Sequence, residues 1–354
     1  MPLTSVRRHP SVRAIATLLV ALSAAAAGCG GGQSSTPADQ AAAPAAAPAA
    51  AQPAAEDAPL PPPAFESALP EGVRSQIATP FKGDLDAMVA RRMIRVGVTF
   101  NRTFYFVDNG VQRGVAYEFG KLFEDELNKK LKTELAGKIN VVFVPLPRDL
   151  IGRALLDGRV DLAIAQVTIR PELQALVDFS IPTRTNVSEV VVTGPGAPAM
   201  ASVDDLAGKE VYARKDSKYY DSLVALNTTL TAKGKAPAVI LEIPGNLEDD
   251  DVLEMVNAGI IPITVVDDYM GAFWQKIFTD ITVHDAVALR TGASLAVPVR
   301  KGSPKLQAEL NGFLAKYGLG TAFGNMMEKR YLVGTRYAKQ ATSPEGRKKY
   351  AALA

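Results

Sequence analysis

The sequence has 354 residues, 47% of them hydrophobic, which is enough apolar material for two domains with buried cores. Its formal net charge is only +2, because 39 Lys and Arg residues nearly balance 37 Asp and Glu residues. This balance argues against a nucleic-acid-binding protein, in which Lys and Arg far exceed Asp and Glu.

The first 28 residues have the features of a signal peptide and are excluded from the fold. Arg7, Arg8 and Arg13 form a basic region, and residues 14–27 form an apolar run too short to span a membrane comfortably. Small residues then precede Cys29, which is the single cysteine of the chain, so no internal disulfide can form. An ordinary signal peptide cleaved nearby and an incidental cysteine remain as alternatives.

The segment Ala26-Ala27-Gly28-Cys29 resembles the lipobox of bacterial lipoproteins, in which the signal is cut before the cysteine and the thiol is lipid-modified. The Leu that usually stands three residues before the cysteine is absent here. By analogy with proteobacterial lipoproteins, Gly30 in place of Asp favours the outer membrane. The resemblance therefore implies a periplasmic protein that is attached to a membrane, favouring the outer membrane, through a lipid on Cys29.

Residues 29–82 are rich in Ala, Pro, Gly, Gln and Ser. Such a segment cannot bury enough apolar surface to offset the entropy of ordering it. Pro44, Pro48 and Pro53 would interrupt any helix in the Ala runs. We therefore predict a disordered, partly polyproline tether between the anchor and a folded body.

The body begins near Asp84 and alternates strand-like with helix-like patterns. Its first part predicts strands at 93–100, 141–145, 161–165 and 187–192, with helices at 114–131 and 149–157 between them. This βαβαβ order predicts a parallel sheet with helices on its faces. The break Gly194-Pro-Gly-Ala-Pro198 is strong enough to mark a crossing between domains.

A second alternation follows that break. It predicts strands at 210–214, 239–243, 263–266, 281–287 and 293–299, and helices from Ser217 and at 250–257, 268–277, 304–316 and 321–332. We expect an α/β fold of two lobes with the second inserted into the first. Lobe 1 takes residues 83–193 and 290–354, and lobe 2 takes residues 194–289.

Short motifs recur along this body in a fixed order. They are Gly114-Val-Ala-Tyr-Glu, Asp161-Leu-Ala-Ile-Ala, Thr168-Ile169, Val177-Asp-Phe-Ser180 and Lys301-Gly-Ser-Pro. Together they resemble the family 3 bacterial extracellular solute-binding proteins, and the likeness covers nearly all of residues 84–316. The resemblance implies a two-lobed periplasmic-binding-protein (Venus flytrap) fold that closes on amino acids or similar polar solutes.

Four further motifs resemble a narrower group. They are Val187-Ser-Glu-Val, Asp251-Val-Leu-Glu-Met-Val-Asn-Ala-Gly259, Val265-Val-Asp-Asp268 and Phe323-Gly-Asn through Lys329-Arg-Tyr331. They are similar to the N-terminal, solute-binding-like module of membrane-bound lytic transglycosylase F. In that family a peptidoglycan-cleaving domain follows at about the point where this sequence stops, so we expect no glycan cleavage by the residues present.

Candidate catalytic groups are few. The only Glu-Ser pair of the kind lytic transglycosylases use is Glu66-Ser67, which falls in the expected tether, where nothing would raise the pKa of the acid. His9 lies in the signal region, and His284 stands alone on a strand-like segment, which favours a structural role. We expect no catalytic residue, no metal site and no cofactor. The acidic run Glu248 to Asp251 favours a helix start over a calcium site.

The resemblance also implies which residues bind the solute. Gln166 and Thr168 occupy the lobe 1 positions that hydrogen-bond the ligand, and Asp267 falls on the position that accepts its ammonium group. Phe104 or Tyr105 would supply an aromatic wall from the first loop. Independently of the resemblance, Ser217 opens a helix whose free backbone N–H groups and hydroxyl could hold an anion. Helix capping, turn formation and core packing are the structural alternatives for these residues.

One position departs from the family pattern. Amino-acid-binding members carry an Arg that clamps the ligand α-carboxylate three residues after the position of Arg170, and this chain has Leu173 there. Arg170 lies about one helical turn earlier. Either its long side chain reaches the same volume, or the clamp has been lost and Arg170 covers the sheet edge.

Three hypotheses follow. The first is a tethered periplasmic receptor for a small polar solute, partnered by an ABC permease or used for sensing. The second is a non-catalytic regulator that senses amino acids or muropeptides and acts on a cell-wall hydrolase partner. The third, an enzyme such as a small dehydratase, lacks a convincing acid/base pair. We expect a monomer that binds no nucleic acid.

Overall fold

The structure is a computed structural model that describes residue 75, residues 79–133 and residues 135–351. The expected signal peptide, Cys29, His9, Glu66-Ser67 and all but the end of the expected tether lie outside the described residues. None of the described helices is long and apolar enough to span a membrane.

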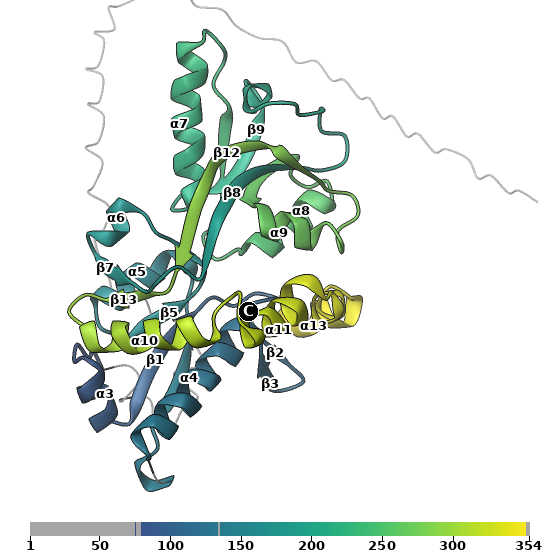
Figure 1. Cartoon of the computed structure of the whole chain (residues 1–354). Helices are drawn as coiled ribbons and strands as arrows, with labels where there is room; N and C mark the ends of the chain where they lie inside the picture. The colour runs from purple at the N-terminus through teal and green to yellow at the C-terminus, as the bar shows by residue number, and fades with distance from the viewer. Residues whose placement is uncertain (1–74, 76–78, 134, 352–354) are drawn as a thin grey trace, which may run out of the picture. The chain divides into compact units, whose positions relative to one another are not determined.

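The first lobe is built on a five-stranded sheet with the order β4–β1–β5–β13–β7 (Figure 1). The strands are β1 (Met93–Val98), β4 (Asn140–Pro145), β5 (Leu162–Ile164), β7 (Val177–Phe179) and β13 (Pro298–Arg300). β1 pairs in parallel with β4 and β5, as the βαβαβ order predicts, and β13 runs antiparallel to β5 and β7. The parallel pairing brings the carboxyl ends of β1, β4 and β5 to one edge of the sheet.

Helices and a small hairpin complete the first lobe. They are α3 (Leu85–Ala90), the hairpin β2 (Phe106–Asp108) with β3 (Val111–Arg113), α4 (Val115–Leu131), η1 (Leu135–Gly137), η2 (Arg148–Leu150), α5 (Ile151–Leu156), α6 (Pro171–Gln174) and α10 (Pro304–Tyr317). The predicted apolar stripe of α4 is buried at Phe123 and Leu127, which pack with Phe313 of α10 and with β1. This burial is what holds the two long helices against the sheet.

The second lobe is built on a six-stranded sheet with the order β10–β9–β11–β8–β12–β6. Its strands are β6 (Val167–Thr168), β8 (Arg184–Thr193), β9 (Glu210–Arg214), β10 (Val239–Ile243), β11 (Ile263–Asp267) and β12 (Thr282–Ala296). Its helices are η3 (Val203–Leu206), α7 (Lys218–Ala232), α8 (Asp249–Asn257) and α9 (Asp268–Trp274). Leu223 of α7 packs with Val265 on one face, whereas Trp274 of α9 packs with Val266 on the other. The sheet is therefore buried on both sides, as the near-continuous apolar strands predict.

The crossing between the lobes lies earlier than the sequence analysis places it. The strand predicted at 187–192, assigned there to lobe 1, is part of β8, which hydrogen-bonds to β11 and β12 in the second sheet. The break at 194–198 is thus a turn inside lobe 2. Gly and Pro signal that the chain turns, and they do not signal which sheet the preceding strand joins.

The return to lobe 1 also differs from the prediction. Instead of two strands at 281–287 and 293–299, the chain forms one long strand, β12, which runs beside β8 (Figure 1), and then the short β13. Register shifts between His284 and Leu295 bend β12, and Gly292 takes a left-handed φ of 73° within it. A strand irregularity of this kind resembles a loop in the sequence.

The last residues of the expected tether (29–82) belong to the folded body. Phe81 N donates a hydrogen bond to Gly158 O at 2.8 Å, and the Arg91 guanidinium lies 3.6 Å from the centre of the Phe81 ring. The backbone carbonyls of Thr79 and Phe81 accept hydrogen bonds from Arg95. Composition does not predict this contact, because it depends on one aromatic side chain, Phe81, and on a few backbone hydrogen bonds.

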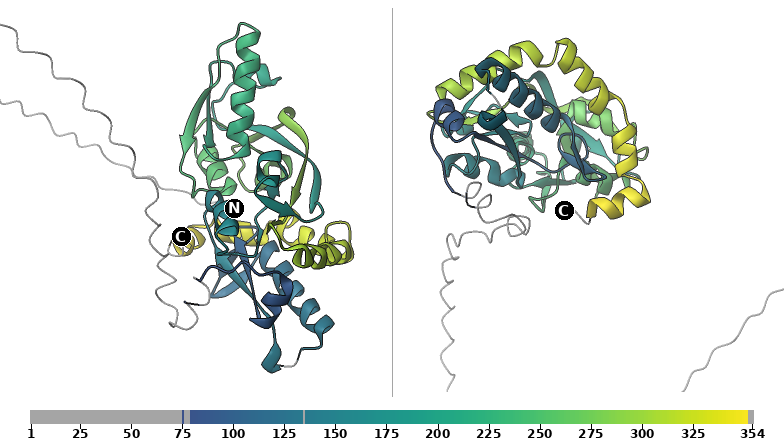
Figure 2. Two further views of the ribbon diagram at one scale, coloured as in Figure 1. Left: turned by 90° about the vertical axis from the view of Figure 1, so that its left-hand side faces the viewer. Right: turned by 90° about the horizontal axis from the view of Figure 1, so that it is seen from below.

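The chain ends in short helical segments that connect the two lobes. They are α11 (Ala322–Glu328), a π-helical turn (η4, Lys329–Val333), α12 (Arg336–Ala341) and α13 (Pro344–Ala351), and they follow one another in a curve in the right-hand view of Figure 2. Leu332 and Ala338 pack into the lobe 2 core beside Trp274. Arg347 of α13 forms an ion pair with Glu254 of α8 at 2.7 Å.

Candidate functional site

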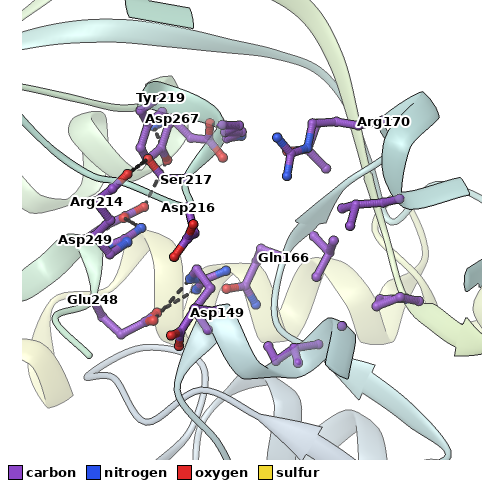
Figure 3. Close-up of a pocket in the computed structure, with 18 of the residues that line it drawn as sticks. Asp149, Gln166, Arg170, Arg214, Asp216, Ser217, Tyr219, Glu248, Asp249 and Asp267 are labelled. Atoms are coloured by element: carbon purple, nitrogen blue, oxygen red, sulfur yellow. Dashed lines mark hydrogen bonds and ion pairs between the residues drawn. The ribbon is translucent and has the colours of Figure 1, made fainter. Parts of the chain in front are cut away.

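A cavity of about 200 Å³ lies between the two lobes and is lined by residues of both (Figure 3). Six of the seven solute-binding residues predicted from the sequence line it: Phe104, Gln166, Thr168, Arg170, Ser217 and Asp267. Tyr105 does not line the cavity. Its side chain is buried in the lobe 1 core with its ring centre 5.7 Å from that of Phe143. Of these two residues only Phe104 reaches the cavity, which Tyr219 and Tyr269 also line.

The loop after β1 is shaped so that Phe104 reaches the cavity. Asn101 Oδ1 accepts a hydrogen bond from Phe104 N at 2.7 Å, and Ala116 N donates to Phe104 O at 2.8 Å. Gly114, with φ 110°, lies so close that a Cβ atom there would stand 2.3 Å from Phe104 O. Only glycine fits this close approach of the two segments. The motif that begins at Gly114 therefore positions the aromatic wall.

Gln166 and Thr168 reach the cavity from the segment that follows β5. Gln166 takes a left-handed φ of 48°, a conformation that is uncommon outside glycine, and its side chain has no hydrogen bond to any described residue. Thr168 is only 7% exposed, and its Oγ1 atom has no hydrogen-bond partner within the part of the chain the structure describes. A buried hydroxyl without a partner costs roughly 1–3 kcal/mol. These two groups are therefore available to a bound molecule.

Arg170 stands on the opposite side of the cavity from the acidic residues (Figure 3). Its Nη1 atom contacts Asp221 Oδ2 of α7 at 2.5 Å, so the side chain joins the two lobes at an exposed position. Leu173, which occupies the family's clamp position, also lines the cavity. The position where a carboxylate clamp is expected therefore lines the cavity but carries an apolar side chain. Arg170, three residues earlier in the sequence, is the cationic residue nearest to it along the chain.

A buried ion pair that the sequence analysis missed joins the lobes at the cavity wall. Arg148 donates from Nη2 to Glu248 Oε2 at 2.5 Å and from Nε to Glu248 Oε1 at 3.1 Å. Burial disfavours the charge on Arg148, but the Glu248 carboxylate more than compensates and holds the pKa of Arg148 above its ordinary value. Nothing in the sequence around Arg148 indicated this pairing, because its partner is 100 residues away.

Asp267, the expected acceptor of the ligand ammonium, already has a cation beside it. Lys218 Nζ contacts Asp267 Oδ1 at 2.5 Å, and both side chains are largely buried. Burial raises the pKa of Asp267 to about 6, although Lys218 opposes this shift. Lys218 was not predicted, because the sequence signal at this helix start is the cap Ser217. The Ser217 Oγ atom accepts a hydrogen bond from Tyr220 N at 3.2 Å and so caps α7.

A second pair completes the lobe 2 wall. Arg214 Nη2 contacts Asp249 Oδ1 at 2.7 Å, and Tyr219 Oη donates to Asp249 Oδ2 at 3.0 Å. Tyr219 Oη in turn accepts a hydrogen bond from Asp267 N at 3.1 Å. Burial favours the neutral acid at Asp249, but Arg214 and Arg148 together hold the pKa of Asp249 below its ordinary value. This wall is therefore a fixed network of charges.

The raised pKa of Asp267 gives a testable pH dependence. Its folded-state pKa of about 6 exceeds the ordinary 3.8, so between pH 4 and pH 6 the native state holds a proton that the unfolded state has lost. The stability that this group contributes is therefore lost as pH rises through that window. We expect the unfolding free energy of Asp267→Asn, relative to the unmodified protein, to rise by about 2 kcal/mol from pH 4 to pH 6. Urea titrations at each pH measure it, and a constant difference would contradict it.

The acidic run at the start of α8 contacts an arginine of lobe 1. Arg102 Nη1 contacts Glu254 at 2.7 Å, Nη2 contacts Asp251 at 3.1 Å, and Nε lies 3.7 Å from Asp250. Glu248 and Asp251 form a capping box at the helix start. Burial and the neighbouring Asp251 raise the pKa of Asp250 to about 8. Among the described residues, no group of His, Cys, Asp or Glu side chains could hold a metal ion.

His284 stands in β12, away from the cavity. Its Nε2 atom lies 2.8 Å from Thr193 Oγ1 of the neighbouring strand β8. Partial burial lowers the pKa of the imidazole, which favours its neutral form. The contact joins two strands of the second sheet, and His284 does not line the cavity.

Two α/β lobes, each with its own sheet, and a cavity with polar groups from both sides define a bilobed binding protein. The model of the bacterial extracellular solute-binding proteins, family 3, matches residues 94–328. The chain therefore belongs to this family, which confirms both the fold and the family expected from the sequence motifs.

The curated relatives found by sequence carry a different name. A membrane-bound lytic murein transglycosylase F from Ectopseudomonas mendocina (strain ymp) is 27% identical over 248 residues, which are 70% of this chain and 47% of that protein. A protein of the same name from Pseudomonas putida (strain KT2440 and its equivalents) is 29% identical over 224 residues, or 63% of this chain and 43% of that one. The chain thus matches less than half of the length of these relatives.

The solved structures that resemble the chain include amino-acid-binding proteins. An ancestral amino acid-binding protein, described as a precursor of cyclohexadienyl dehydratase, has a TM-score of 0.57 and 23% identity, and the match covers 70% of this chain and 99% of that one. A Salmonella typhimurium periplasmic binding protein with high arginine specificity has a TM-score of 0.54 and 19% identity, and the match covers 68% of this chain and 99% of that one. At these identities the likeness shows the fold.

Proposed function

We propose that this protein binds a small polar solute, amino-acid-like or peptide-like, in the cavity between its lobes. The observation that carries the proposal is Thr168 Oγ1, a buried hydroxyl that has no partner among the described residues and lines the cavity beside the unpaired amide of Gln166. A bound carboxylate or amide would satisfy both groups. Arg170, on the far side, could add a charge-assisted hydrogen bond to a ligand carboxylate if it left Asp221.

The mechanism would be closure of two lobes on the solute. Direct contacts between the lobes already exist at Arg148 with Glu248 and at Arg102 with the start of α8. A solute that adds hydrogen bonds to both lobes would stabilise this arrangement further. Binding would then shift the equilibrium toward the closed form, and the size of the shift would equal the difference in the solute's binding free energy between the closed and the open form.

A periplasmic location and a lipid anchor complete this proposal, and both are supported by sequence alone. The family is extracellular, and the segment that ends at Cys29 resembles a lipobox. Cys29→Ala should therefore release the protein from the membrane fraction into the soluble fraction, whereas Ser23→Ala, outside the lipobox, should not. Membrane association that survives in Cys29→Ala would contradict the anchor.

Solute binding has two candidate biological roles. Delivery to an ABC permease follows the general role of solute-binding proteins. Regulation of a cell-wall hydrolase is the second candidate, because the curated relatives are named lytic murein transglycosylases and the match falls on 47% or less of their length. A solute that is a peptidoglycan fragment would favour the second candidate.

A thermal-shift screen tests the binding function. The panel is the twenty common amino acids together with short peptidoglycan stem peptides. A solute at about one hundred times its Kd should raise the unfolding free energy by about 2.7 kcal/mol. Thr168→Val, which replaces the hydroxyl by a methyl group, should weaken that solute about tenfold. Thr229→Val, on the exposed face of α7, is the matched control. No stabilisation by any member of the panel would contradict the proposal.

A further inference from the structure

The charges that line the cavity are unequally matched. Four cationic and six acidic side chains line it. Each cation already contacts a carboxylate: Arg148 with Glu248, Arg170 with Asp221, Arg214 with Asp249 and Lys218 with Asp267. The excess at the cavity is therefore negative, and each of the four described cations that line it already has a carboxylate partner.

Two of the acidic residues have no partner. Asp149 of η2 in lobe 1 and Asp216, just before α7 in lobe 2, make no side-chain hydrogen bond or ion pair with any described residue. Figure 3 shows both on the same side of the cavity, across from Arg170. Asp149 Oδ2 also lies 3.5 Å from the position that a Cβ atom at Gly245 of lobe 2 would take, so the closed lobes bring it against the second lobe.

Independent groups show that this cavity is prepared for a ligand. Thr168 Oγ1 is buried, lines the same space and lacks a partner among the described residues. The Oδ1 atom of Asp250, which is fully buried and also lines the cavity, lacks one too. The unpaired buried atoms are open to a bound molecule, and the unpaired carboxylates of Asp149 and Asp216 favour a ligand that carries hydrogen-bond donors.

The position expected to hold a ligand ammonium is already neutralised. The resemblance assigns that role to Asp267, but the Lys218 ammonium group contacts its carboxylate. A ligand ammonium would have to displace a covalently tethered cation there. Asp149 and Asp216 require no such displacement, and only water stands to be removed from them.

The sign of the charge then decides which solutes suit the site. A neutral solute that expelled water would leave two carboxylates in a medium of lower dielectric constant, where desolvation raises their free energy. A cationic group of the solute that contacted them would offset this cost. Resting on the proposed solute-binding function, we propose that the cavity selects solutes with a net positive charge, and that Asp149 and Asp216 bind the cationic group.

Isosteric pairs of amino acids separate charge from shape. L-arginine is compared with L-citrulline, and L-lysine with L-2-aminoheptanoic acid, in which a methyl group replaces the ammonium group, by isothermal titration calorimetry on the purified protein. We expect the cationic member of each pair to bind at least about tenfold more tightly. Asp149→Asn and Asp216→Asn should each reduce that ratio several-fold. Glu210→Gln, which removes the same charge at the far end of β9 from the cavity, should leave the ratio unchanged.

Each outcome has a distinct meaning. Equal affinity within both pairs overturns the proposal, as does a ratio that survives in both Asn variants. If only neutral or acidic members of the thermal-shift panel bind, the charge selection is wrong and the solute-binding function stands. If nothing in that panel binds, the solute-binding function itself fails, and the charge selection fails with it. Because both aspartates are exposed, the variants should fold, which circular dichroism checks.

Discussion

Replacing Asp161 with Asn is expected to lower the free energy of unfolding by about 3 to 5 kcal/mol, because it leaves buried guanidinium groups without their anion. Asp161 is 0% exposed, and it accepts hydrogen bonds from Arg95 N at 2.8 Å and from Arg91 Nη2 at 2.5 Å. Its other oxygen lies 3.2 Å from both Arg95 Nη2 and Arg300 Nη1. One carboxylate thus serves three arginines.

The same arginines hold the backbone of the lobe together. Arg95 Nη2 donates to Gly158 O at 2.5 Å, and Arg300 Nη2 donates to Gly83 O at 2.5 Å. Losing Asp161 should therefore loosen the segment that enters the lobe as well as the strands β1, β5 and β13. Urea titration followed by circular dichroism measures the loss.

Asp157→Asn is the matched control for this effect. Asp157 pairs with Arg153 at 2.8 Å, one helical turn earlier, but both side chains are largely exposed. Such a pair contributes about 0.5 kcal/mol or less. A comparable loss in the two variants would mean that the Asp161 cluster is not the buried anchor of lobe 1.

The second large effect concerns the contact between the lobes. Glu248→Gln removes the anion that balances Arg148 at the cavity wall, where Arg148 Nη2 and Glu248 Oε2 are 2.5 Å apart. In an open form Arg148 would regain water, whereas in the closed form it would be partly buried and unpaired. We expect the balance to shift toward the open form by about 2 kcal/mol, or roughly thirtyfold.

Small-angle X-ray scattering measures this shift as a larger radius of gyration in Glu248→Gln. Glu242→Gln is the control, because Glu242 pairs with Lys215 within lobe 2 at 3.3 Å and both side chains are exposed. The control should scatter like the unmodified protein. A radius of gyration in Glu248→Gln that matches the control would show that other contacts, such as those of Arg102, are sufficient to hold the lobes.

Much of the fold was predictable because the local signals agree with the tertiary structure. The strands at 210–214 and 239–243 begin and end where the sequence predicts, and α4 follows the apolar periodicity after Gly114. The errors occur where the local sequence pattern does not reveal which sheet a strand joins or where a strand ends. Residues 184–193 pair with lobe 2 although the turn signals come after them, and β12 continues through Gly292, which resembles a break.

The site was predictable only as far as the family motifs reach. Gln166, Thr168 and Asp267 follow buried strands at motif positions, and all three line the cavity. Lys218 and Arg148 were missed because their importance depends on partners that are distant in sequence, 49 residues away for Lys218 and 100 for Arg148. Of the two aromatic residues that the sequence offers for the cavity wall, Phe104 lines the cavity and Tyr105 is buried in the lobe 1 core.

These charge pairs also limit how far the family pattern applies to this chain. Leu173 lines the cavity at the position where the resemblance implies a carboxylate clamp, and Lys218 contacts Asp267, where it implies an ammonium acceptor. Among the described residues that line the cavity, the polar groups without a partner include Thr168 Oγ1, the Gln166 amide, Asp250 Oδ1, Asp149 and Asp216. A solute that binds here is therefore expected to use a different set of contacts within the same cavity.

The most direct test of the cavity as a solute site is a crystal structure of the protein with the solute that gives the largest thermal shift. The expected result is electron density between the lobes, with the solute accepting or donating a hydrogen bond at Thr168 Oγ1 and contacting residues of both lobes. An empty cavity in a crystal that holds the solute elsewhere on the protein would contradict the proposed function.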